Sequence, residues 1–283
     1  MIGEGGQVGS ALVAAASTRG LDVIGTSRHG RDLDRRLDLL DHTSIRRVVQ
    51  AAAPTHVVLS AALTSVVACE RDPAGTGRIN VDGSLVVAES ARQAGARMVF
   101  LSTDYAFDGE AGPYDERAEP RPINEYGRQK LAVEEAVAQL PDGVIVRTCQ
   151  VFGPDPRRAN YVLRVADDLP AGRRVRAATD LFGTPTLVAD LVASLLDLTV
   201  GRADGTWHVA GPDFLSRFEL ARLTAAAAGA DPDLVEGVPF ATIADDVPRP
   251  RRAGLVSTRV HDPPFLVTPL PVALESLFRS GGG

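Results

Sequence analysis

Tyr126 and Lys130, four positions apart in the segment EYGRQKL, are the residues whose types and spacing best suit chemistry. Lys130 is the only lysine among the 30 lysine and arginine residues, so the chain uses arginine at every other basic position. Helical spacing puts the two side chains on one face, and a nearby ammonium is expected to lower the pKa of the phenol. Such a tyrosine can donate a proton to a carbonyl oxygen. The pair therefore predicts acid–base catalysis on a carbonyl compound.

Thr103 is the third candidate for this chemistry. It lies in LSTDYAFDG (101–109), directly after an apolar segment typical of a buried strand. Ligands of open α/β sheets bind at the carboxyl ends of the strands, where the Thr103 hydroxyl can hydrogen-bond a substrate carbonyl. The slim ammonium of Lys130 suits the hydroxyl groups of a nicotinamide ribose, which an arginine would crowd. We expect Thr103, Tyr126 and Lys130 to form the catalytic set.

A glycine-rich turn near the amino terminus predicts a dinucleotide site. Gly3, Gly6 and Gly9 have the spacing G-x-x-G-x-x-G, and the helical segment SALVAAAS follows at once. Such a turn lets backbone amides approach a pyrophosphate at the positive end of a helix.

Ser27 and Arg28 suggest which dinucleotide binds. They follow the apolar segment VIGTS, with Arg31 close by, at the point where an acidic residue would bind the ribose hydroxyls of NAD. An arginine there can bind a 2′-phosphate. The sequence therefore favours NADP(H) over NAD(H) as the cofactor.

Apolar segments alternate with helical patterns through the first half of the chain. Strands are predicted over 23–27, 56–62, 97–102 and 144–148, and helices over 10–20, 43–54, 80–95 and 126–141. This alternation predicts an α/β fold with a doubly wound, Rossmann-like parallel sheet. After residue 150 segments rich in Pro, Gly and Arg replace the pattern. We predict a dinucleotide-binding domain over 1–149 and a smaller substrate-binding lobe over 150–283, with some segments returning to the first domain.

The first strand of this sheet is predicted to be truncated, because only Met1 and Ile2 precede the glycine turn. A missing strand would cost several buried residues at about 1.5–3 kcal/mol each. We hypothesise that the true start lies a few residues upstream; otherwise the fold compensates in another way.

Composition excludes several functional classes. The net charge of −6 argues against nucleic-acid binding, and no apolar run reaches the roughly 18 residues that span a membrane. Cys69 and Cys149 provide neither a disulfide framework nor the spacing of a metal site. We expect a cytoplasmic protein without a metal centre. The oligomeric state cannot be read from the sequence.

Six segments together resemble a known family: GEGGQVG, SAALTSVVACERDP, STDYAFDG, NEYGRQKLAVEEA, VRTCQVFG and FGTPTLVADL. In order and spacing they are similar to the extended short-chain dehydrogenase/reductases, and more narrowly to the dTDP-4-dehydrorhamnose reductases, which are sugar-nucleotide 4-ketoreductases. The resemblance covers nearly the whole chain.

The resemblance implies further site residues. The residues that it implies contact the cofactor are Gly6, Gln7 and Val8 at the pyrophosphate, Asp38 and Leu39 beside the adenine, and Ala62, Leu63 and Thr64 after the next strand. Those implied on the substrate are Thr103 and Asp104 at the sugar, with Arg251 and Arg252 as candidates for the nucleotide diphosphate.

Two departures from the family concern the substrate. Gln150 stands where the family commonly has a tryptophan against the sugar, and Asp180-Leu181 stands where it has an Asp-Gln pair. We therefore expect a sugar that differs in hydroxylation or stereochemistry.

The function that these observations imply is NADPH-dependent reduction of the 4-keto group of a nucleotide-activated deoxysugar. One alternative is a non-catalytic, NADP-binding regulatory subunit like the β subunit of methionine adenosyltransferase, which the same resemblance includes. Another is a sugar-nucleotide epimerase or dehydratase of the same fold.

Overall fold

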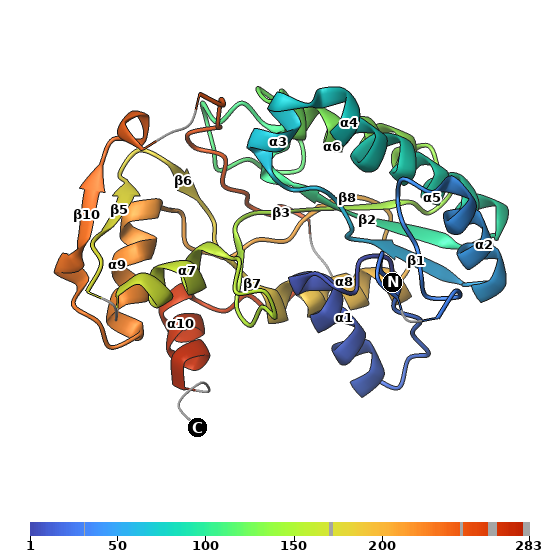
Figure 1. Cartoon of the computed structure of the whole chain (residues 1–283), viewed down its shortest axis with the longest axis horizontal. Coiled ribbons are helices and arrows are strands. Elements are labelled where there is room, and N and C mark those ends of the chain that lie inside the picture. Colours follow the sequence, from blue (N-terminus) through green and yellow to red (C-terminus); the bar gives the residue numbers. More distant parts are fainter. Residues whose placement is uncertain (31, 170–171, 244–245, 260–264, 280–283) are drawn as a thin grey trace.

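Four parallel strands run through the larger lobe of the computed structural model (Figure 1). The structure describes residues 1–30, 32–169, 172–243, 246–259 and 265–279. The strands are β1 (His56–Leu59), β2 (Arg97–Thr103), β3 (Val144–Thr148) and β8 (Gly205–His208), in the order β1-β2-β3-β8. Every residue of β3 is buried, as expected for a strand covered on both faces. The strands predicted over 97–102 and 144–148 are confirmed.

Ile2 extends this sheet beyond β1. It forms parallel bridges with Leu59 on one side and with Thr26 on the other, and it is 4% exposed. Its amide donates to the Val58 carbonyl over 2.9 Å. One bridged residue thus takes the position of the first strand, between the β1 edge and Thr26. The resulting strand order is that of a doubly wound sheet, and the predicted fold class is confirmed.

Two predicted strands are corrected. Residues 23–25 of the region predicted as 23–27 form no strand, and only Thr26 and Ser27 take part in bridges, because Ile2 supplies a single partner residue. The strand predicted over 56–62 ends at Leu59. Beyond this point the amides of Ser60 and Ala61 both donate to the Ile2 carbonyl. The regular hydrogen bonding of the parallel strand therefore stops.

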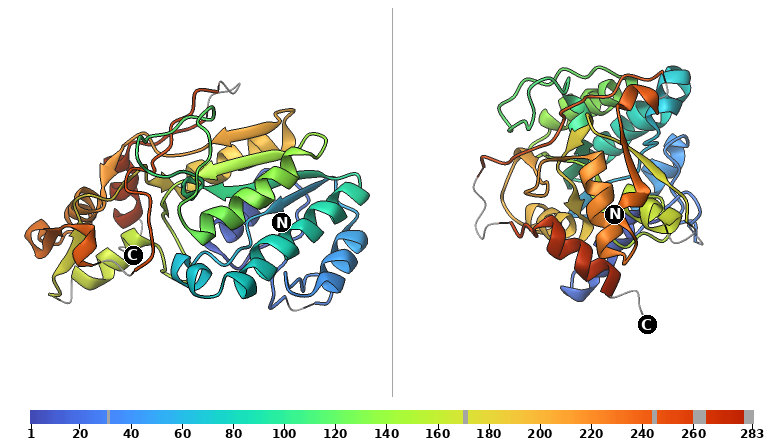
Figure 2. Two further views of the ribbon diagram at one scale, coloured as in Figure 1. Left: turned by 90° about the horizontal axis from the view of Figure 1, so that it is seen from above. Right: turned by 90° about the vertical axis from the view of Figure 1, so that its left-hand side faces the viewer.

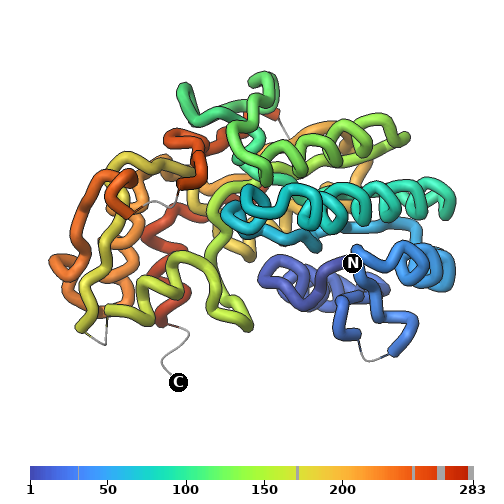
Figure 3. Tube along the Cα trace, turned by 45° about the horizontal axis from the view of Figure 1, so that its top comes forward, coloured from blue at the N-terminus to red at the C-terminus, as the bar shows by residue number. Residues whose placement is uncertain are grey.

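Helices cover both faces of the sheet (Figures 1 and 2). On one face α1 (Gln7–Thr18) packs against α8 (Val188–Val200). On the other, α2 (His42–Ala52), α5 (Ser84–Gln93) and α6 (Glu125–Ala138) lie side by side (Figure 3). Short helices α3 (Val66–Arg71) and α4 (Pro73–Gly77) precede a π-helical turn at Arg78–Gly83. The predicted helix over 80–95 is therefore divided between this turn and α5.

A smaller lobe lies at one end of the sheet (Figure 1). Its helices are α7 (Tyr161–Asp168), α9 (Arg217–Ala227) and α10 (Leu270–Arg279), and its strands are β4 (Val151–Phe152), β5 (Val175–Ala178), β6 (Phe182–Gly183), β7 (Thr186–Leu187), β9 (Leu215–Ser216) and β10 (Val235–Val238). Short 3₁₀ turns lie at Asp104–Ala106, Pro232–Leu234 and Phe240–Thr242. Between these strands, α8 and β8 return to the larger lobe. The domain boundary between residues 149 and 150 stays a prediction.

Within the described ranges, the structure contains no helix that combines the length and apolar character needed to cross a bilayer.

Candidate functional site

The first turn of α6 positions Tyr126 and Lys130. Asn124 caps this helix, because its Oδ1 accepts from the Gly127 amide over 2.9 Å. A Cβ on Gly127 would lie 2.2 Å from the Tyr105 carbonyl oxygen, so glycine allows α6 to pack directly on the turn that follows β2. Both side chains of the pair are buried.

Lys130 lies beneath the end of β2. Its Nζ donates to the Leu101 carbonyl over 2.6 Å and stands 4.0 Å from the centre of the Phe100 ring. Burial lowers the pKa of the ammonium to about 7, and the charge of Glu134 opposes this shift. The amine therefore titrates near neutral pH.

Tyr126 is brought together with Thr103, whose hydrogen bond acts to lower the tyrosine pKa. Burial is the larger effect and raises the pKa above its ordinary value, and the charge of Asp104 adds to the increase. The lowered pKa expected from Lys130 is therefore wrong for this structure. The Tyr105 ring packs edge-on against the Tyr126 ring, with 5.8 Å between centres, and contributes to the apolar surroundings.

Asp104 forms a buried polar cluster beside this pair. Thr103 Oγ1 donates to Asp104 Oδ1 over 3.1 Å, and Cys149 Sγ donates to Asp104 Oδ2 over 3.0 Å. Burial raises the pKa of Asp104 to about 6 and raises the pKa of the Cys149 thiol. Both groups are thus shifted toward their neutral forms.

The glycine turn has the shape of a pyrophosphate cradle. Gly3 has a φ of +106°, and a Cβ on Gly9 would lie 2.0 Å from the Gly3 carbonyl oxygen. Gly6 caps α1 without a side-chain hydrogen bond, and the first turn contains no acidic residue. Free amides at a helix start attract anions. The cradle therefore fits the pyrophosphate of a dinucleotide.

Two further predicted cofactor residues, Gln7 and Val8, lie in the first turn of α1. Gln7 Nε2 donates to the carbonyls of Gly153 and Pro154 over 3.2 and 3.3 Å, so the side chain joins the two lobes. Val8 packs partly buried against the core under α1.

The residues predicted at the adenosine end lie on the next segments. Ser27 lies beside Gly5, and the exposed Arg28 donates from Nε to His29 Nε2 over 3.4 Å; Arg31 is outside the described residues. Asp38 Oδ1 accepts from the Leu40 amide over 3.0 Å, and Leu39 is buried in the core.

Asn80, which the sequence reasoning missed, fixes the segment 62–64. Its Oδ1 accepts from the Leu63 amide over 2.7 Å, and its Nδ2 donates to the Leu63 carbonyl over 2.9 Å. The same Nδ2 donates to Gln129 Oε1 over 2.8 Å. The only signal was an amide at the start of a predicted helix, which a helix cap explains equally well. Leu63 is thereby tied to α6, and Ala62 and Thr64 flank it.

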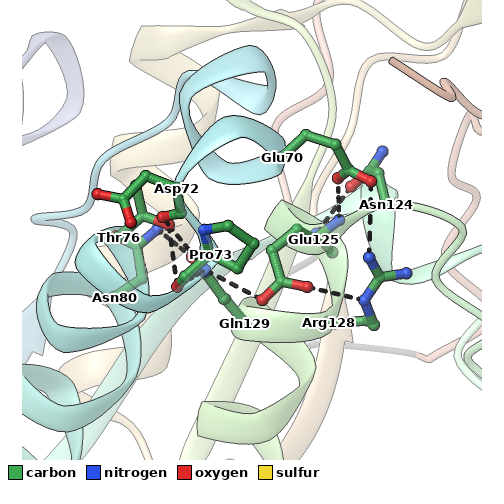
Figure 4. A network of polar contacts seen from close by, with 10 residues as sticks. Glu70, Asp72, Pro73, Thr76, Asn80, Asn124, Glu125, Arg128 and Gln129 are labelled. Carbon is green, nitrogen blue, oxygen red and sulfur yellow. Dashed lines mark hydrogen bonds and ion pairs between the residues drawn. The ribbon is translucent and has the colours of Figure 1, made fainter. Parts of the chain in front are cut away.

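Gln129 and Glu125 continue this network on α6 (Figure 4). Gln129 Nε2 donates to Thr76 Oγ1 over 2.9 Å. The Glu125 amide donates to Glu70 Oε2 over 2.8 Å, and Arg128 Nε donates to Glu125 Oε2 over 2.9 Å. The helix that carries Tyr126 and Lys130 is thus bound to α3 and α4.

Comparisons with known proteins assign this architecture to a family. The model of the RmlD substrate binding domain matches residues 1–269. The chain belongs to the RmlD substrate binding domain family.

Two relatives of this RmlD family member are named as reductases. It is 35% identical to a dTDP-4-keto-6-deoxy-D-glucose reductase of Streptomyces niveus over 252 residues, 88% of this chain and 85% of that protein. It is 34% identical to a dTDP-4-dehydrorhamnose reductase of Mycobacterium tuberculosis over 264 residues, 90% of this chain and 83% of that protein. A crystal structure of dTDP-4-dehydrorhamnose reductase from Bacillus anthracis in complex with NADP superposes with a TM-score of 0.90 and 28% identity, covering 99% of this chain and 97% of that one.

Gln150, which the sequence predicts to contact the substrate, has an unusual backbone conformation. Its φ is +46°, in the left-handed region, and a Cβ on Gly183 would lie 2.2 Å from Gln150 Nε2. The amide therefore packs against β6, next to Cys149. Asp180 Oδ1 accepts from the Phe240 amide over 2.6 Å, while Leu181 is buried.

Arg251 and Arg252, the diphosphate candidates in this RmlD family member, are separated. Arg251 lines a cavity of about 480 Å³ together with Arg249 and Phe240, and its guanidinium stands 4.6 Å from the centre of the Phe240 ring. Arg252 instead lies 4.9 Å and 5.0 Å from the centres of the Phe182 and Phe214 rings and is not among the lining residues. Asn124 Nδ2 donates to the Pro248 carbonyl over 3.0 Å, which connects the cavity wall to the cap of α6.

Proposed function

We propose that this protein reduces the 4-keto group of a nucleotide-activated deoxysugar with NADPH. The observation that carries the proposal is the contact between Thr103 and Tyr126 at the carboxyl end of β2, above Lys130. The named reductases to which the chain is 34–35% identical support it, as does the NADP-bound crystal structure of similar fold.

The raised pKa of Tyr126 suits a proton donor. A phenol with a raised pKa keeps its proton at neutral pH and can transfer it to the substrate oxygen. The Thr103 hydroxyl orients the same oxygen. The keto carbon accepts a hydride, which NADPH supplies when bound, so hydride and proton together give the alcohol. Lys130 is proposed to bind the ribose hydroxyls beside this centre.

The cofactor is proposed to be NADP(H) in preference to NAD(H). Ser27 Cβ lies near Gly5 of the glycine turn, and the next residue, Arg28, is exposed, so a 2′-phosphate bound there would find a cationic partner. Neither residue has the carboxylate that would bind free ribose hydroxyls.

The substrate is proposed to lie between the two lobes. Arg249, Arg251 and Asp246 line the cavity near Phe240, and Arg251 also forms an ion pair with Asp180 over 3.1 Å. The two guanidinium groups are the proposed partners of a nucleoside diphosphate there. Asp104 and Gln150 would then contact the sugar. The cytoplasmic location expected from the sequence is retained as part of this proposal.

Tyr126→Phe tests the function. The variant keeps the ring and loses the acidic proton, so we expect turnover of a dTDP-4-keto-6-deoxysugar to fall by about 10²–10⁴-fold, the usual contribution of general acid catalysis. NADPH affinity, measured by fluorescence titration, should stay within a few-fold of the wild type.

Tyr161→Phe is the matched control, because its hydroxyl donates to the Arg217 carbonyl in the smaller lobe. It should retain turnover. Full activity of Tyr126→Phe would refute the proposed role, and a wild type that binds NADPH without reducing any keto sugar would indicate a regulatory subunit.

A further inference from the structure

Two adjacent arginines in the segment 153–160 have different surroundings. Arg158 forms an ion pair with Asp167, in which Nε donates to Oδ2 over 3.0 Å. Arg157 is exposed and has no ion pair with any carboxylate of the described residues. An arginine without a carboxylate partner is available to an external anion.

The backbone around Arg157 is held in place by a buried carboxylate. Asp155 is 9% exposed; its Oδ1 accepts from the Arg157 amide over 3.0 Å and its Oδ2 from the Ala159 amide over 2.8 Å. The Arg158 amide donates to the Asp155 carbonyl over 2.9 Å. The position of Arg157 is therefore fixed by the turn, although its side chain is on the surface.

The same segment is attached to the glycine turn. Gln7 Nε2 donates to the carbonyls of Gly153 and Pro154 over 3.2 and 3.3 Å. Asn160 Nδ2 donates to the Gly153 carbonyl over 3.1 Å. Residues from the start of the smaller lobe are thus held against the start of α1.

The Arg157 guanidinium faces Gly6. A Cβ built on Gly6 would lie 3.7 Å from Arg157 Nη2, and Gly6 caps α1 without a side-chain hydrogen bond. The amides of the first helical turn and the guanidinium therefore border one space. Both favour an anion there, the amides through the helix dipole and the guanidinium through charge-assisted hydrogen bonds.

We infer that Arg157 binds the pyrophosphate of the dinucleotide from the side opposite α1, so that the cofactor is held by both lobes. This inference rests on the proposed function, because it presupposes dinucleotide binding. It assigns Arg157 and Arg28 to different phosphates: the pyrophosphate is common to NADPH and NADH, whereas the 2′-phosphate proposed for Arg28 is present only in NADPH.

Calorimetric titration of four proteins tests the assignment: the wild type, Arg157→Gln, Arg158→Gln and Arg28→Gln. Each is titrated with NADPH, NADH and ADP-ribose, which contains the pyrophosphate without nicotinamide. We expect Arg157→Gln to weaken all three affinities by about 10- to 100-fold, because charged hydrogen bonds contribute about 1.5–3 kcal/mol. Arg158→Gln is the matched control and should bind all three as the wild type does.

Arg28→Gln should weaken NADPH alone. Arg157→Lys keeps the charge without the planar fork and should lose less affinity than Arg157→Gln. The wild-type affinity should also decrease more steeply with salt than that of Arg157→Gln. Unchanged thermal unfolding of the variants would show that the losses are not due to misfolding.

Equal affinities of Arg157→Gln and Arg158→Gln for all three ligands would overturn the inference while leaving the proposed function intact. A loss confined to NADPH would move Arg157 to the 2′-phosphate and would also overturn it. A wild type that binds none of the three would instead refute the proposed function, and the inference would fall with it.

Discussion

Lys130 holds its ammonium 4.0 Å from the centre of the Phe100 ring and donates to the Leu101 carbonyl, with only 4% of its surface exposed. The spacing of Tyr126 and Lys130 could be predicted from the sequence, because a helix fixes which residues share a face. Their pKa values could not, because burial is the largest cause of both shifts and depends on β2 and on the turn that follows it.

The single lysine makes the Lys130 pKa directly measurable. In protein labelled with ¹³C at lysine Cε, one resonance is expected to titrate with a midpoint of about 7, against the ordinary value of 10.5. The same sample in urea is the control and should titrate near 10.5. A midpoint near 10.5 in the folded protein would contradict the burial described here.

The lowered pKa of Lys130 also determines how the stability of the protein changes with pH. Between pH 7 and 10.5 the unfolded chain binds a proton at Lys130 that the folded protein does not bind. The free energy of unfolding should therefore rise with pH across this window. Comparison with Lys130→Met by urea unfolding isolates the contribution, because the variant lacks the titrating group. Equal pH dependence of both proteins would show that the folded pKa is not lowered.

Substitutions at Gly6 and at Gly9 should separate an effect on cofactor binding from an effect on folding. A Cβ on Gly6 meets no protein atom nearer than 3.5 Å, whereas one on Gly9 would lie 2.0 Å from the Gly3 carbonyl. We expect Gly6→Ala to fold normally and to bind NADPH more weakly, by tenfold or more, because the methyl enters the proposed pyrophosphate space. Gly9→Ala should lower the melting temperature itself. Calorimetry and thermal unfolding measure the two effects, and normal NADPH binding by Gly6→Ala would exclude a pyrophosphate at this point.

At the scale of elements, α6 is fixed to the sheet by a buried ion pair. Arg147 on β3 donates from Nε to Glu134 Oε1 over 3.1 Å and from Nη2 to Glu134 Oε2 over 2.5 Å, and Ser102 also donates to this carboxylate. Both side chains of the pair are buried. The pair joins the helix that carries Tyr126 and Lys130 to the strand next to β2.

Glu134→Gln should be strongly destabilising, because it leaves the Arg147 charge buried without its partner. We expect a loss of about 3–5 kcal/mol in the free energy of unfolding, measured by urea denaturation. The double variant Glu134→Leu/Arg147→Met removes both charges and should recover much of this loss. If the free energy of unfolding of Glu134→Gln lies within about 1 kcal/mol of the wild-type value, the ion pair does not hold α6 on the sheet.

Helices α1, α2, α5 and α6 and strands β2 and β3 were predictable from periodicity, because each is apolar on its buried faces. Helix α8 and strand β8 were not predicted, because they follow residue 150, where segments rich in Pro, Gly and Arg replace the alternating pattern. The strand predicted over 23–27 failed because its neighbour in the sheet is one bridged residue, Ile2. Asn80 was missed because its role depends on Leu63 and Gln129, which are distant in sequence. Strands of two residues, such as β4 and β6, are too short to leave a pattern.

At the scale of the whole molecule, the two lobes meet through the segment 153–160 and the start of α1. If the dinucleotide is held by both, its binding should stabilise both. Hydrogen exchange is expected to slow at the amides of residues 6–10 and of 153–160 together when NADPH is added. In Arg157→Gln at saturating NADPH, the slowing at 153–160 should be lost while that at 6–10 remains. Slowing confined to 6–10 in the wild type would indicate that the smaller lobe does not take part.

The burial of Lys130 also determines how this protein reacts with acylating reagents. Apart from the amino terminus, Lys130 is the only primary amine in the chain, and the outward-facing cations are guanidinium groups, which succinimidyl esters do not acylate. Conjugation through amines, the usual route to dyes and resins, therefore has almost no surface targets here. Slow incorporation of such a reagent at Lys130 would instead report each opening of α6 away from β2, and a bound dinucleotide would suppress it.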